Sequence, residues 1–188
     1  MKALILFLFL GIPALADLAA CDEAYRHSAY DVTLKECSPL ADRGNARAQF
    51  IIGTMYNDGH GVPQDYRAAA RWFRLAADQG YDFAQDYLGQ MYAEGRGVPQ
   101  DYREAVRLYR LAADREETGA QNNLGMMYAN GQGVPQDYIQ AHMWFNLAGA
   151  NGYSEGATNR DSIAKKMTPG QIAEAQRLAR EWKPKIDR

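Results

Sequence analysis

The sequence predicts an all-α fold in which antiparallel helix pairs stack in a row, with a further helix capping the C-terminal end. Three observations predict it: one segment recurs at a fixed spacing, each copy holds two apolar stretches of helical period, and a glycine- and proline-containing loop separates those stretches. The chain has 188 residues, 47% of them hydrophobic, which is enough for one continuous core. Its formal net charge is −2, and without a basic excess we expect no binding to nucleic acid.

The repeat is the strongest signal. The segment Val62–Tyr66 recurs as Val98–Tyr102 and again as Val134–Tyr138, with a spacing of 36 residues both times. A glycine keeps this period, and so do a Met-Tyr pair and an Ala-Gln pair: Gly53, Gly89 and Gly125; Met55, Met91 and Met127 with the tyrosine after each; Ala48, Ala84 and Ala120 with the glutamine after each. Three complete units therefore occupy residues 44–151 without an insertion, which indicates a repeat architecture.

Each unit predicts two helices. Apolar residues of the first stretch fall on one helical face, as do those of the second: Ala84, Tyr87, Leu88, Met91 and Tyr92 in the first, and Tyr66, Ala69, Phe73, Ala76 and Ala77 in the second. In the loop between them, Gly59 can end the first helix with positive φ, and Pro63 prevents that helix from continuing. Asp65 is the expected N-cap of the second helix.

A glycine inside the first helix of every unit points to packing. Gly53 costs about 1 kcal/mol relative to alanine in a helix interior. Its presence at the same place in all three units predicts a close approach between helices. A two-helix unit cannot bury its apolar face alone, so neighbouring units must stack.

The shared pattern A-Q-x-x-L-G-x-M-Y-x-x-G-x-G-V-P-Q-D-Y-x-x-A-x-x-W-x-x-x-A-A resembles the Sel-one-like repeat (SLR) family, a relative of the tetratricopeptide (TPR) repeat. The resemblance implies a right-handed α-solenoid with a concave binding face. Glu116 stands where Gly80 and Gly152 stand in the neighbouring units, and we therefore expect an altered turn between units two and three. Leu108 replaces the tryptophan found as Trp72 and Trp144.

The first 16 residues read as a bacterial signal peptide. Lys2 precedes an apolar run over residues 3–10, and Ala14-Leu15-Ala16 is an A-x-A cleavage signature. The run is shorter than the roughly 20 residues that a membrane span needs. We expect cleavage near Ala16 and a periplasmic or secreted mature protein that begins near Asp17.

Residues 17–43 predict an N-terminal helical hairpin that carries both cysteines. Cys21 and Cys37 lie symmetrically about position 29, in a short polar stretch. If that stretch turns the hairpin, the cysteines face each other and can form a disulfide in an oxidising compartment. The alternative is a lipid anchor at Cys21, because Leu18-Ala19-Ala20-Cys21 resembles a bacterial lipobox. Asp17 interrupts the apolar run ahead of that motif, and acylation would leave Cys37 unpaired.

Residues 152–188 break the period and predict C-terminal capping helices. Thr168 and Gln171 fit a capping box, with Pro169 at the first helical position. The helix that follows carries an apolar stripe able to cover the last unit: Ile172, Ala175, Ala179 and Trp182.

Catalytic chemistry finds little support in the sequence. The three histidines lack ligand spacing, so we expect no metal site, and nothing implies a cofactor: His27, His60 and His142. His60 stands where the other units have Arg96 and Gln132, which indicates free variation. Ser162 and Lys165 match S-x-x-K, but neither S-D-N nor K-T-G occurs. We predict no catalytic residue. The alternative function is a β-lactamase-like or cell-wall-directed hydrolase, as suggested for some secreted, cysteine-rich relatives.

A binding face is expected where the units differ. Residues that are the same in all units indicate positions used for packing, whereas variable positions on the first helices can contact a specific partner. The resemblance implies that these helices line the concave face, which gives the candidate contacts Arg47, Phe50, Thr54, Phe83, Asp86, Gln90, Asn122 and Met126. Phe50 and Phe83 would be the aromatic anchors. We expect an adaptor that binds proteins of the cell envelope, and the resemblance also allows a regulatory role there.

Overall fold

The computed structural model describes residues 12–185, and within them it is helical throughout, with no strand. Ten helices follow one another: α1 (Ile12–Arg26), α2 (Tyr30–Asp42), α3 (Ala46–Asp58), α4 (Tyr66–Asp78), α5 (Asp82–Glu94), α6 (Tyr102–Ala113), α7 (Thr118–Asn130), α8 (Tyr138–Ala150), α9 (Ser154–Ala164) and α10 (Pro169–Glu181). Residues 1–11 of the expected signal peptide lie outside the described residues, and α1 runs across the expected cleavage position at Ala16.

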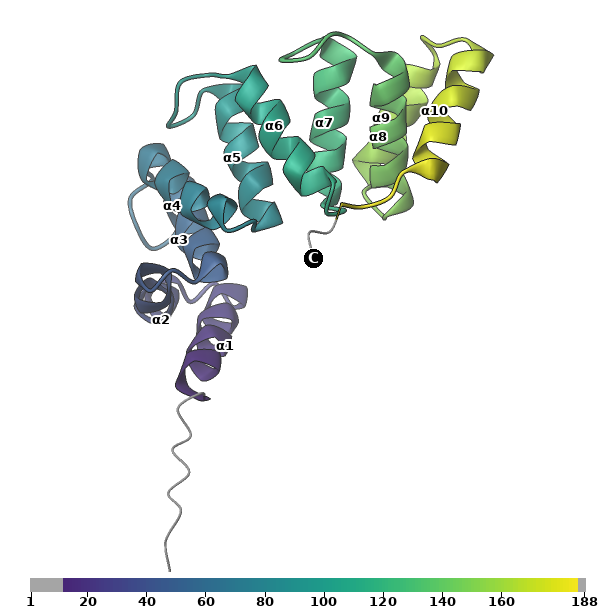
Figure 1. Cartoon of the computed structure of the whole chain (residues 1–188). Helices are drawn as coiled ribbons and strands as arrows, with labels where there is room; N and C mark the ends of the chain where they lie inside the picture. The colour runs from purple at the N-terminus through teal and green to yellow at the C-terminus, as the bar shows by residue number, and fades with distance from the viewer. Residues whose placement is uncertain (1–11, 186–188) are drawn as a thin grey trace, which may run out of the picture.

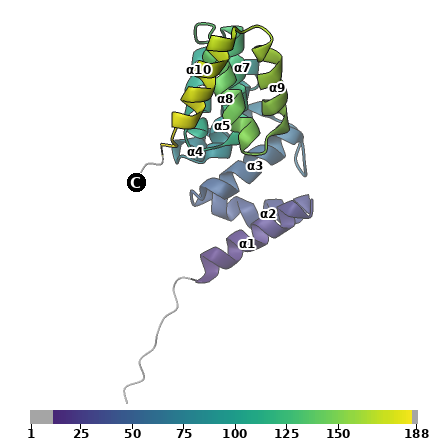
Figure 2. The ribbon, with the colours of Figure 1, turned by 90° about the vertical axis from the view of Figure 1, so that its right-hand side faces the viewer.

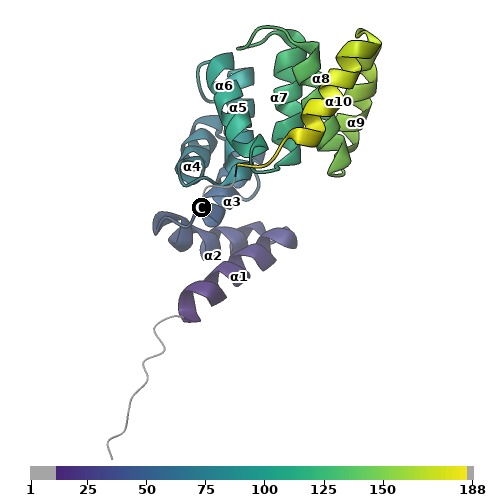
Figure 3. The ribbon, with the colours of Figure 1, turned by 45° about the vertical axis from the view of Figure 1, so that its right-hand side comes forward.

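The helices form a curved row in chain order, as Figure 1 shows. The two side views place the pair α1–α2 at one end of this row and α9 and α10 at the other (Figures 2 and 3). The pairs α3–α4, α5–α6 and α7–α8 are the three predicted units, called units one, two and three below. The all-α solenoid expected from the repeat is confirmed. No helix in the described part of the chain is long and apolar enough to cross a membrane.

Within each unit, an aromatic ring lies over the helix-interior glycine. A Cβ atom on Gly53 would stand 2.7 Å from the ring of Phe73. Gly89 has the same relation to Tyr109, at 2.8 Å, and Gly125 to Phe145, at 2.6 Å. Because real Cβ contacts are longer than this, only glycine lets the two helices of a unit pack at this distance. The close approach predicted from the sequence is confirmed.

The loop inside each unit ends one helix and begins the next as expected. Gly59 caps α3 in the left-handed conformation, with φ of 73°. The side chain of Asp65 then accepts hydrogen bonds from the backbone N–H groups of Arg67 and Ala68, at 2.9 and 3.0 Å. These bonds satisfy two of the N–H groups that a helix start leaves unpaired. Gly95 with Asp101, and Gly131 with Asp137, repeat the arrangement.

The same loop also seats each unit on the preceding one. A Cβ atom on Gly97 would collide with the backbone of Tyr66 in unit one, and one on Gly133 with the backbone of Tyr102 in unit two. The loop residue before this glycine packs on the same tyrosine. Arg96 lies over the ring of Tyr66, with its guanidinium carbon 5.5 Å from the ring centroid.

His60 makes the equivalent contact one unit earlier. Its ring stacks on Tyr30 of α2, with centroids 4.5 Å apart. The free variation expected at this loop position is therefore wrong for His60, because the side chain packs between units. Hydrogen bonds from arginine to tyrosine also join consecutive units. Arg74 of unit one donates to the hydroxyl of Tyr92 in unit two at 2.6 Å, and Arg110 of unit two donates to that of Tyr128 in unit three at 2.7 Å.

The turn between units two and three corrects a prediction. Glu116 has φ of 68°, close to the 81° of Gly80, so the turn keeps the left-handed conformation that was expected to change. The hydrogen bonds explain why. Glu116 donates to Ala113 and Glu117 to Ala112, at 3.0 and 3.1 Å, as the residues of the turn at Gly80 do at 2.9 and 3.1 Å. The helix termination thus fixes the backbone, and glutamate carries the strain of positive φ.

At the N-terminal end, a disulfide joins α1 to α2. Cys21 and Cys37 are both fully buried, their Cα atoms are 5.0 Å apart, and the bond closes a sequence separation of 16 residues. The hairpin turns at Ser28, next to the predicted midpoint. The predicted pairing is thus present, and a sulfur atom bonded to Cys37 cannot carry a thioether-linked lipid.

At the C-terminal end, α10 packs on α8. The capping box of Thr168 and Gln171 is present as predicted. Trp182 meets Trp144 edge to face, with ring centroids 5.9 Å apart. The chain then turns back beneath α8 (Figure 1), and Lys185 donates its backbone N–H to the carbonyl of Asp114 at 2.8 Å.

Candidate protein-binding surface

The first helices α3, α5, α7 and α9 form a continuous surface, called the first-helix face below. Side chains on adjacent helices meet there in a regular register, in which a residue contacts the one 37 positions later. Phe50 meets Tyr87 edge to face, with ring centroids 5.4 Å apart. Asn123 donates to the carboxylate of Asp86 at 2.9 Å. Asn159 donates to the side-chain carbonyl of Asn122, also at 2.9 Å. Positions 50, 86 and 122 therefore carry different side chains in successive units, and the positions that contact them, 87, 123 and 159, differ along with them. We call these two sets the variable column and the contact column.

The N-terminal part of this face is aromatic. Phe50 lies at the centre of a cluster and is itself partly buried. Its ring centroid is 5.3 to 6.1 Å from those of four neighbours: Phe73, Tyr81, Phe83 and Tyr87. Of the five rings, Phe83 is the exposed one, with 47% of its surface accessible. Phe50 therefore supports the cluster, whereas Phe83 offers its ring to a partner.

The middle of the face is acidic. Asp86 of α5 and Glu117, the N-cap of α7, approach each other around Gly119, where an added Cβ atom would lie 3.3 Å from an oxygen of Asp86 and 3.2 Å from one of Glu117. Burial, then the nearby charge of Glu117, raises the pKa of Asp86 to about 7, while the hydrogen bond from Asn123 acts in the opposite direction. Burial also raises the pKa of Glu117. Two neighbouring carboxyl groups make this part of the face suited to a cation from outside.

The C-terminal part of the face is a shallow depression between α7 and α9, with a volume of about 330 Å³. Three side-chain amides help to line it, and one of them, Asn122, is buried and accepts a hydrogen bond from Asn159. Met126 stands at the edge with 40% of its surface exposed. A flexible, apolar side chain beside polar groups is common at protein-binding surfaces.

The remaining predicted contacts differ in accessibility. Arg47 is half exposed and donates to Asp22 of α1 at 2.6 Å. Gln90 is partly buried. Thr54 is buried, and its hydroxyl donates to carbonyls of its own helix, so it does not reach the surface. The face therefore exposes Arg47, Phe83 and Met126 most clearly, while Phe50 and Asn122 serve contacts between units.

Sequence reasoning missed the contact column and the second carboxylate. Tyr87, Asn123 and Asn159 were not among the candidates, although each directly follows, one unit later, a position that varies between units. Glu117 was not among the candidates either, although it caps α7 and lies near Asp86. A comparison of neighbouring columns would have shown that positions 50 and 87, 86 and 123, and 122 and 159 change together.

The alternative hydrolase site gains no geometric support. Ser162 and Lys165 are both exposed at the end of α9, and their side chains make no hydrogen bond to each other. A serine nucleophile needs a base within hydrogen-bond reach and usually an enclosed site. Among the residues that the structure describes, no group of His, Cys, Asp and Glu is arranged to hold a metal ion.

Two solved structures are similar to this chain over most of its length. A Sel1 repeat protein from Oxalobacter formigenes aligns with a TM-score of 0.72 and 28% identity, covering 85% of this chain and 63% of the other. The c5321 protective antigen of uropathogenic Escherichia coli, which has an SLR fold, aligns with a TM-score of 0.64 and 26% identity, covering 89% of this chain and 45% of the other. This chain thus spans less than two thirds of either structure. No curated protein matches it.

The family profile agrees with the architecture. The Sel1 repeat matches three times, at residues 46–81, 82–116 and 118–153, which are units one, two and three. These matches cover more than half of the chain, and their boundaries fall at the turns that carry positive φ. The family and its fold support a scaffold for protein–protein interaction. The chain belongs to the Sel1 repeat family.

Proposed function

We propose that this protein is an exported adaptor that binds a segment of a partner protein on the first-helix face. The observation that carries the proposal is the exposed ring of Phe83 beside the carboxyl pair of Asp86 and Glu117. Large exposed aromatic side chains are the usual anchors of protein interfaces. A neighbouring pair of carboxyl groups adds selectivity for charge.

The chemistry of the face selects the partner segment. An apolar side chain would pack on Phe83, and a lysine or arginine beside it would reach the carboxyl pair. A second apolar side chain would lie over Met126, at the edge of the depression between α7 and α9. The proposed partner is therefore a basic segment with two apolar anchors.

Export to the cell envelope is the second part of the proposal. It is supported by the signal-peptide pattern over residues 1–16 and by the buried disulfide between Cys21 and Cys37. Disulfides persist in oxidising compartments and are rare in the cytosol. The intact mass of protein recovered from the envelope tests this part. We expect a chain that starts at Asp17 and has lost two hydrogen atoms, whereas a mass increase from acylation at Cys21 would contradict it.

Site-specific crosslinking tests the binding face. A benzoylphenylalanine residue in place of Phe83 should crosslink to a discrete partner in living cells. Leu75 on α4 gives a matched control, because it is exposed to a similar degree, 49% against 47%, on a second helix. We expect no discrete product from position 75.

Purified components then test the chemistry. A peptide taken from the crosslinked segment should bind the purified protein, and Phe83→Ala should weaken binding at least tenfold, the typical effect of losing an anchor. Equal crosslinking from positions 83 and 75, or a peptide that binds Phe83→Ala as tightly as the native protein, would contradict the proposal.

A further inference from the structure

The second helices of units one and two carry arginines at the same three positions. All six side chains are exposed: Arg67, Arg71 and Arg74 in α4, and Arg103, Arg107 and Arg110 in α6. The leucine after the third arginine is exposed as well, by 49% for Leu75 and by 43% for Leu111. Basic and apolar side chains thus share the exposed face of both helices, and their surroundings decide which helix can hold a ligand.

A groove of about 430 Å³ runs beside α6, between this helix and the loop of unit three. Its apolar lining comes from Val106, Leu111 and Val134, and the three arginines of α6 supply its basic lining. We call it the α6 groove. Its volume falls within the range of small-molecule sites in proteins. None of its residues belongs to the first-helix face, so a ligand bound here leaves that face free for a protein partner.

Two arginines of the α6 groove can take up an anion. Within the described residues, no hydrogen bond or ion pair engages the guanidinium group of Arg103. Arg110 uses one nitrogen atom to donate to the hydroxyl of Tyr128, and its other N–H groups face no carboxylate partner in this part of the chain. Arg107 is the paired one, because Glu104 accepts two hydrogen bonds from it, at 2.6 and 2.8 Å.

The carboxylate in the lining of the α6 groove is neutralised by the C-terminal segment. Asp114 follows the last residue of α6, and Nζ of Lys185 lies 2.9 Å from its carboxylate. The backbone N–H of Lys185 also donates to the carbonyl of Asp114, which holds the segment in place. The ion pair therefore reduces the repulsion between Asp114 and an anion in the groove.

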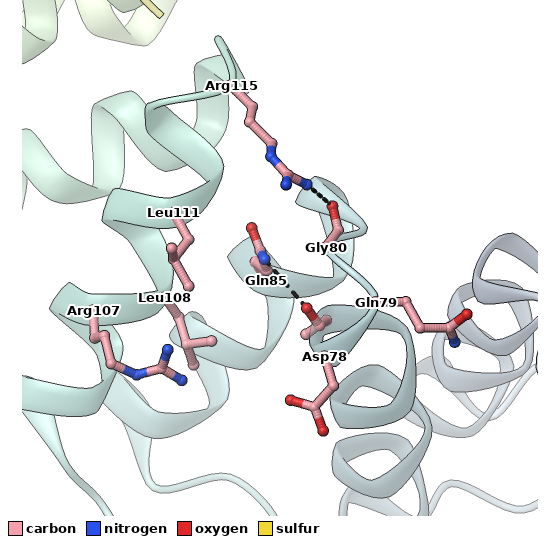
Figure 4. Close-up of a pocket in the computed structure, with 9 residues that line it drawn as sticks. Asp78, Gln79, Gly80, Gln85, Arg107, Leu108, Leu111 and Arg115 are labelled. Atoms are coloured by element: carbon pink, nitrogen blue, oxygen red, sulfur yellow. Dashed lines mark hydrogen bonds between the residues drawn. The ribbon is translucent and has the colours of Figure 1, made fainter. Parts of the chain in front are cut away.

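The opposite side of α6 differs in charge. Toward α4, Arg107 and Leu111 border a second cavity, of about 360 Å³, which Figure 4 shows. Asp78 lies there at the end of α4, where it occupies the position that Asp114 has in α6. No described residue makes an ion pair with Asp78. Its charge opposes an anion on that side, so an anion is favoured in the α6 groove.

We propose that the α6 groove binds an alkyl carboxylate of the kind that a free fatty acid provides. Arg103 and Arg110 hold its head, and its chain packs on the apolar lining. The two arginines stand seven positions apart, a rise of about 10 Å along the helix, which two arginine side chains can span between them. A guanidinium group binds a carboxylate through two parallel N–H groups, and the alkyl chain gains free energy by leaving water.

A titration followed by NMR tests the ligand. The protein, with its disulfide intact, is labelled with ¹⁵N and at its leucine and valine methyl groups, and is titrated with sodium octanoate. We expect shifts of the Val106 and Leu111 methyl resonances and of the Arg103 Nε–H, with a dissociation constant on the order of 1 mM. Acetate lacks the chain and 1-octanol lacks the charge, so at the same concentration each should give little or no shift.

Matched substitutions on α6 and α4 test the head group. Arg103→Gln together with Arg110→Gln should weaken octanoate binding at least about tenfold. Arg67→Gln together with Arg74→Gln removes the same charge from the equivalent positions of α4 and should leave binding within about twofold. The pairs are closely matched, because Arg74 donates to a tyrosine hydroxyl as Arg110 does.

The chain and the ion pair have controls of their own. Leu111→Ser should weaken octanoate binding about threefold or more, whereas Leu75→Ser, at the equivalent exposed position of α4, should not. Lys185→Gln leaves Asp114 charged beside the groove and should weaken binding about threefold. Adding Asp114→Asn to that variant should restore the native affinity.

The proposal is overturned if saturating octanoate moves none of the groove resonances, or if acetate or 1-octanol reproduces the shifts. It is also overturned if the α4 pair of substitutions weakens binding as much as the α6 pair. A membrane surface is the competing occupant. Sedimentation with vesicles of equal parts phosphatidylcholine and phosphatidylglycerol, lost in the α6 pair while octanoate gives no shift, would assign the arginines to lipid headgroups and contradict the proposal.

Discussion

At the N-terminal end of the helix row, α1 and α2 are held by the bond between Cys21 and Cys37, whereas at the C-terminal end α10 is held on α8 by packing. The described side chains that α1 and α2 bury are few and mostly small, so the apolar area of this pair is limited. The C-terminal end instead buries Met143 and Trp144 against α10. This difference shows that a row of repeated units needs specialised ends. It also shows that a disulfide can stabilise an end that buries little apolar area.

The C-terminal cap is encoded in α8 itself. Arg71 of unit one and Arg107 of unit two are exposed, and Met143 takes their place in unit three. Likewise, Ile139 stands where the other units have arginines. Arginine keeps an outer helix face in water, and methionine lets α10 cover it.

The largest expected effect comes from breaking this cap. Met143→Arg restores the residue of the other units beneath α10 and would bury a charge without a partner, which costs about 3–5 kcal/mol. We expect α10 to leave α8, with fast amide hydrogen exchange over residues 169–181 and a lower Tm. Met143→Leu is the matched control and should change stability by less than about 1.5 kcal/mol. Unchanged protection of α10 in Met143→Arg would contradict this account of the cap.

The disulfide should come next in size. Replacing Cys21 and Cys37 together by serine removes the constraint on a 16-residue separation, which corresponds to about 3 kcal/mol. Because each unit contacts only its neighbours, we expect faster exchange in α1 and α2 and native protection in α7 and α8. Uniform loss of protection along the chain would show that the two ends do not behave independently.

The acidic centre should respond to pH, and the ends should not. The pKa of Asp86 is raised to about 7, so the folded state holds this proton more tightly than the unfolded state does. The stabilisation is complete below about pH 4 and is lost as the pH rises through 7. Asp86→Asn keeps an acceptor for Asn123 and removes the titration. Relative to the native protein, it should gain about 2 kcal/mol between pH 5 and pH 8, measured by urea unfolding. A difference independent of pH would contradict the raised pKa.

The smallest expected effect lies in the turn between units two and three. Four equivalent turn positions have positive φ. Three of them are glycines, Gly44, Gly80 and Gly152, and the fourth is Glu116, which the substitution Glu116→Gly brings into line with the others. Relief of that strain should stabilise the protein by about 0.5–1 kcal/mol. A small rise in Tm checks this, and Glu116→Ala, which keeps the strain, should show no such rise.

Sequence alone predicted the helices, their caps and the stacking, because each depends on local chemistry that recurs every 36 residues. It predicted the disulfide from the symmetric placement of Cys21 and Cys37 about position 29. It could not predict the register of the first-helix face. Whether Phe50 meets Tyr87 or another residue depends on how far each unit is rotated against the next, which no local pattern encodes. It also misjudged Glu116, because the intrinsic preference of glutamate suggested a different turn than the helix termination enforces.

The seating of Gly97 on Tyr66, and of Gly133 on Tyr102, makes consecutive units interchangeable at their joints. At both joints between units, the loop glycine of one unit packs on the backbone at the start of the second helix of the preceding unit. Duplication or excision of one 36-residue module would therefore leave all remaining joints intact, and array length could change in evolution without inventing a new interface. The greater length of the two similar structures is consistent with such modular growth.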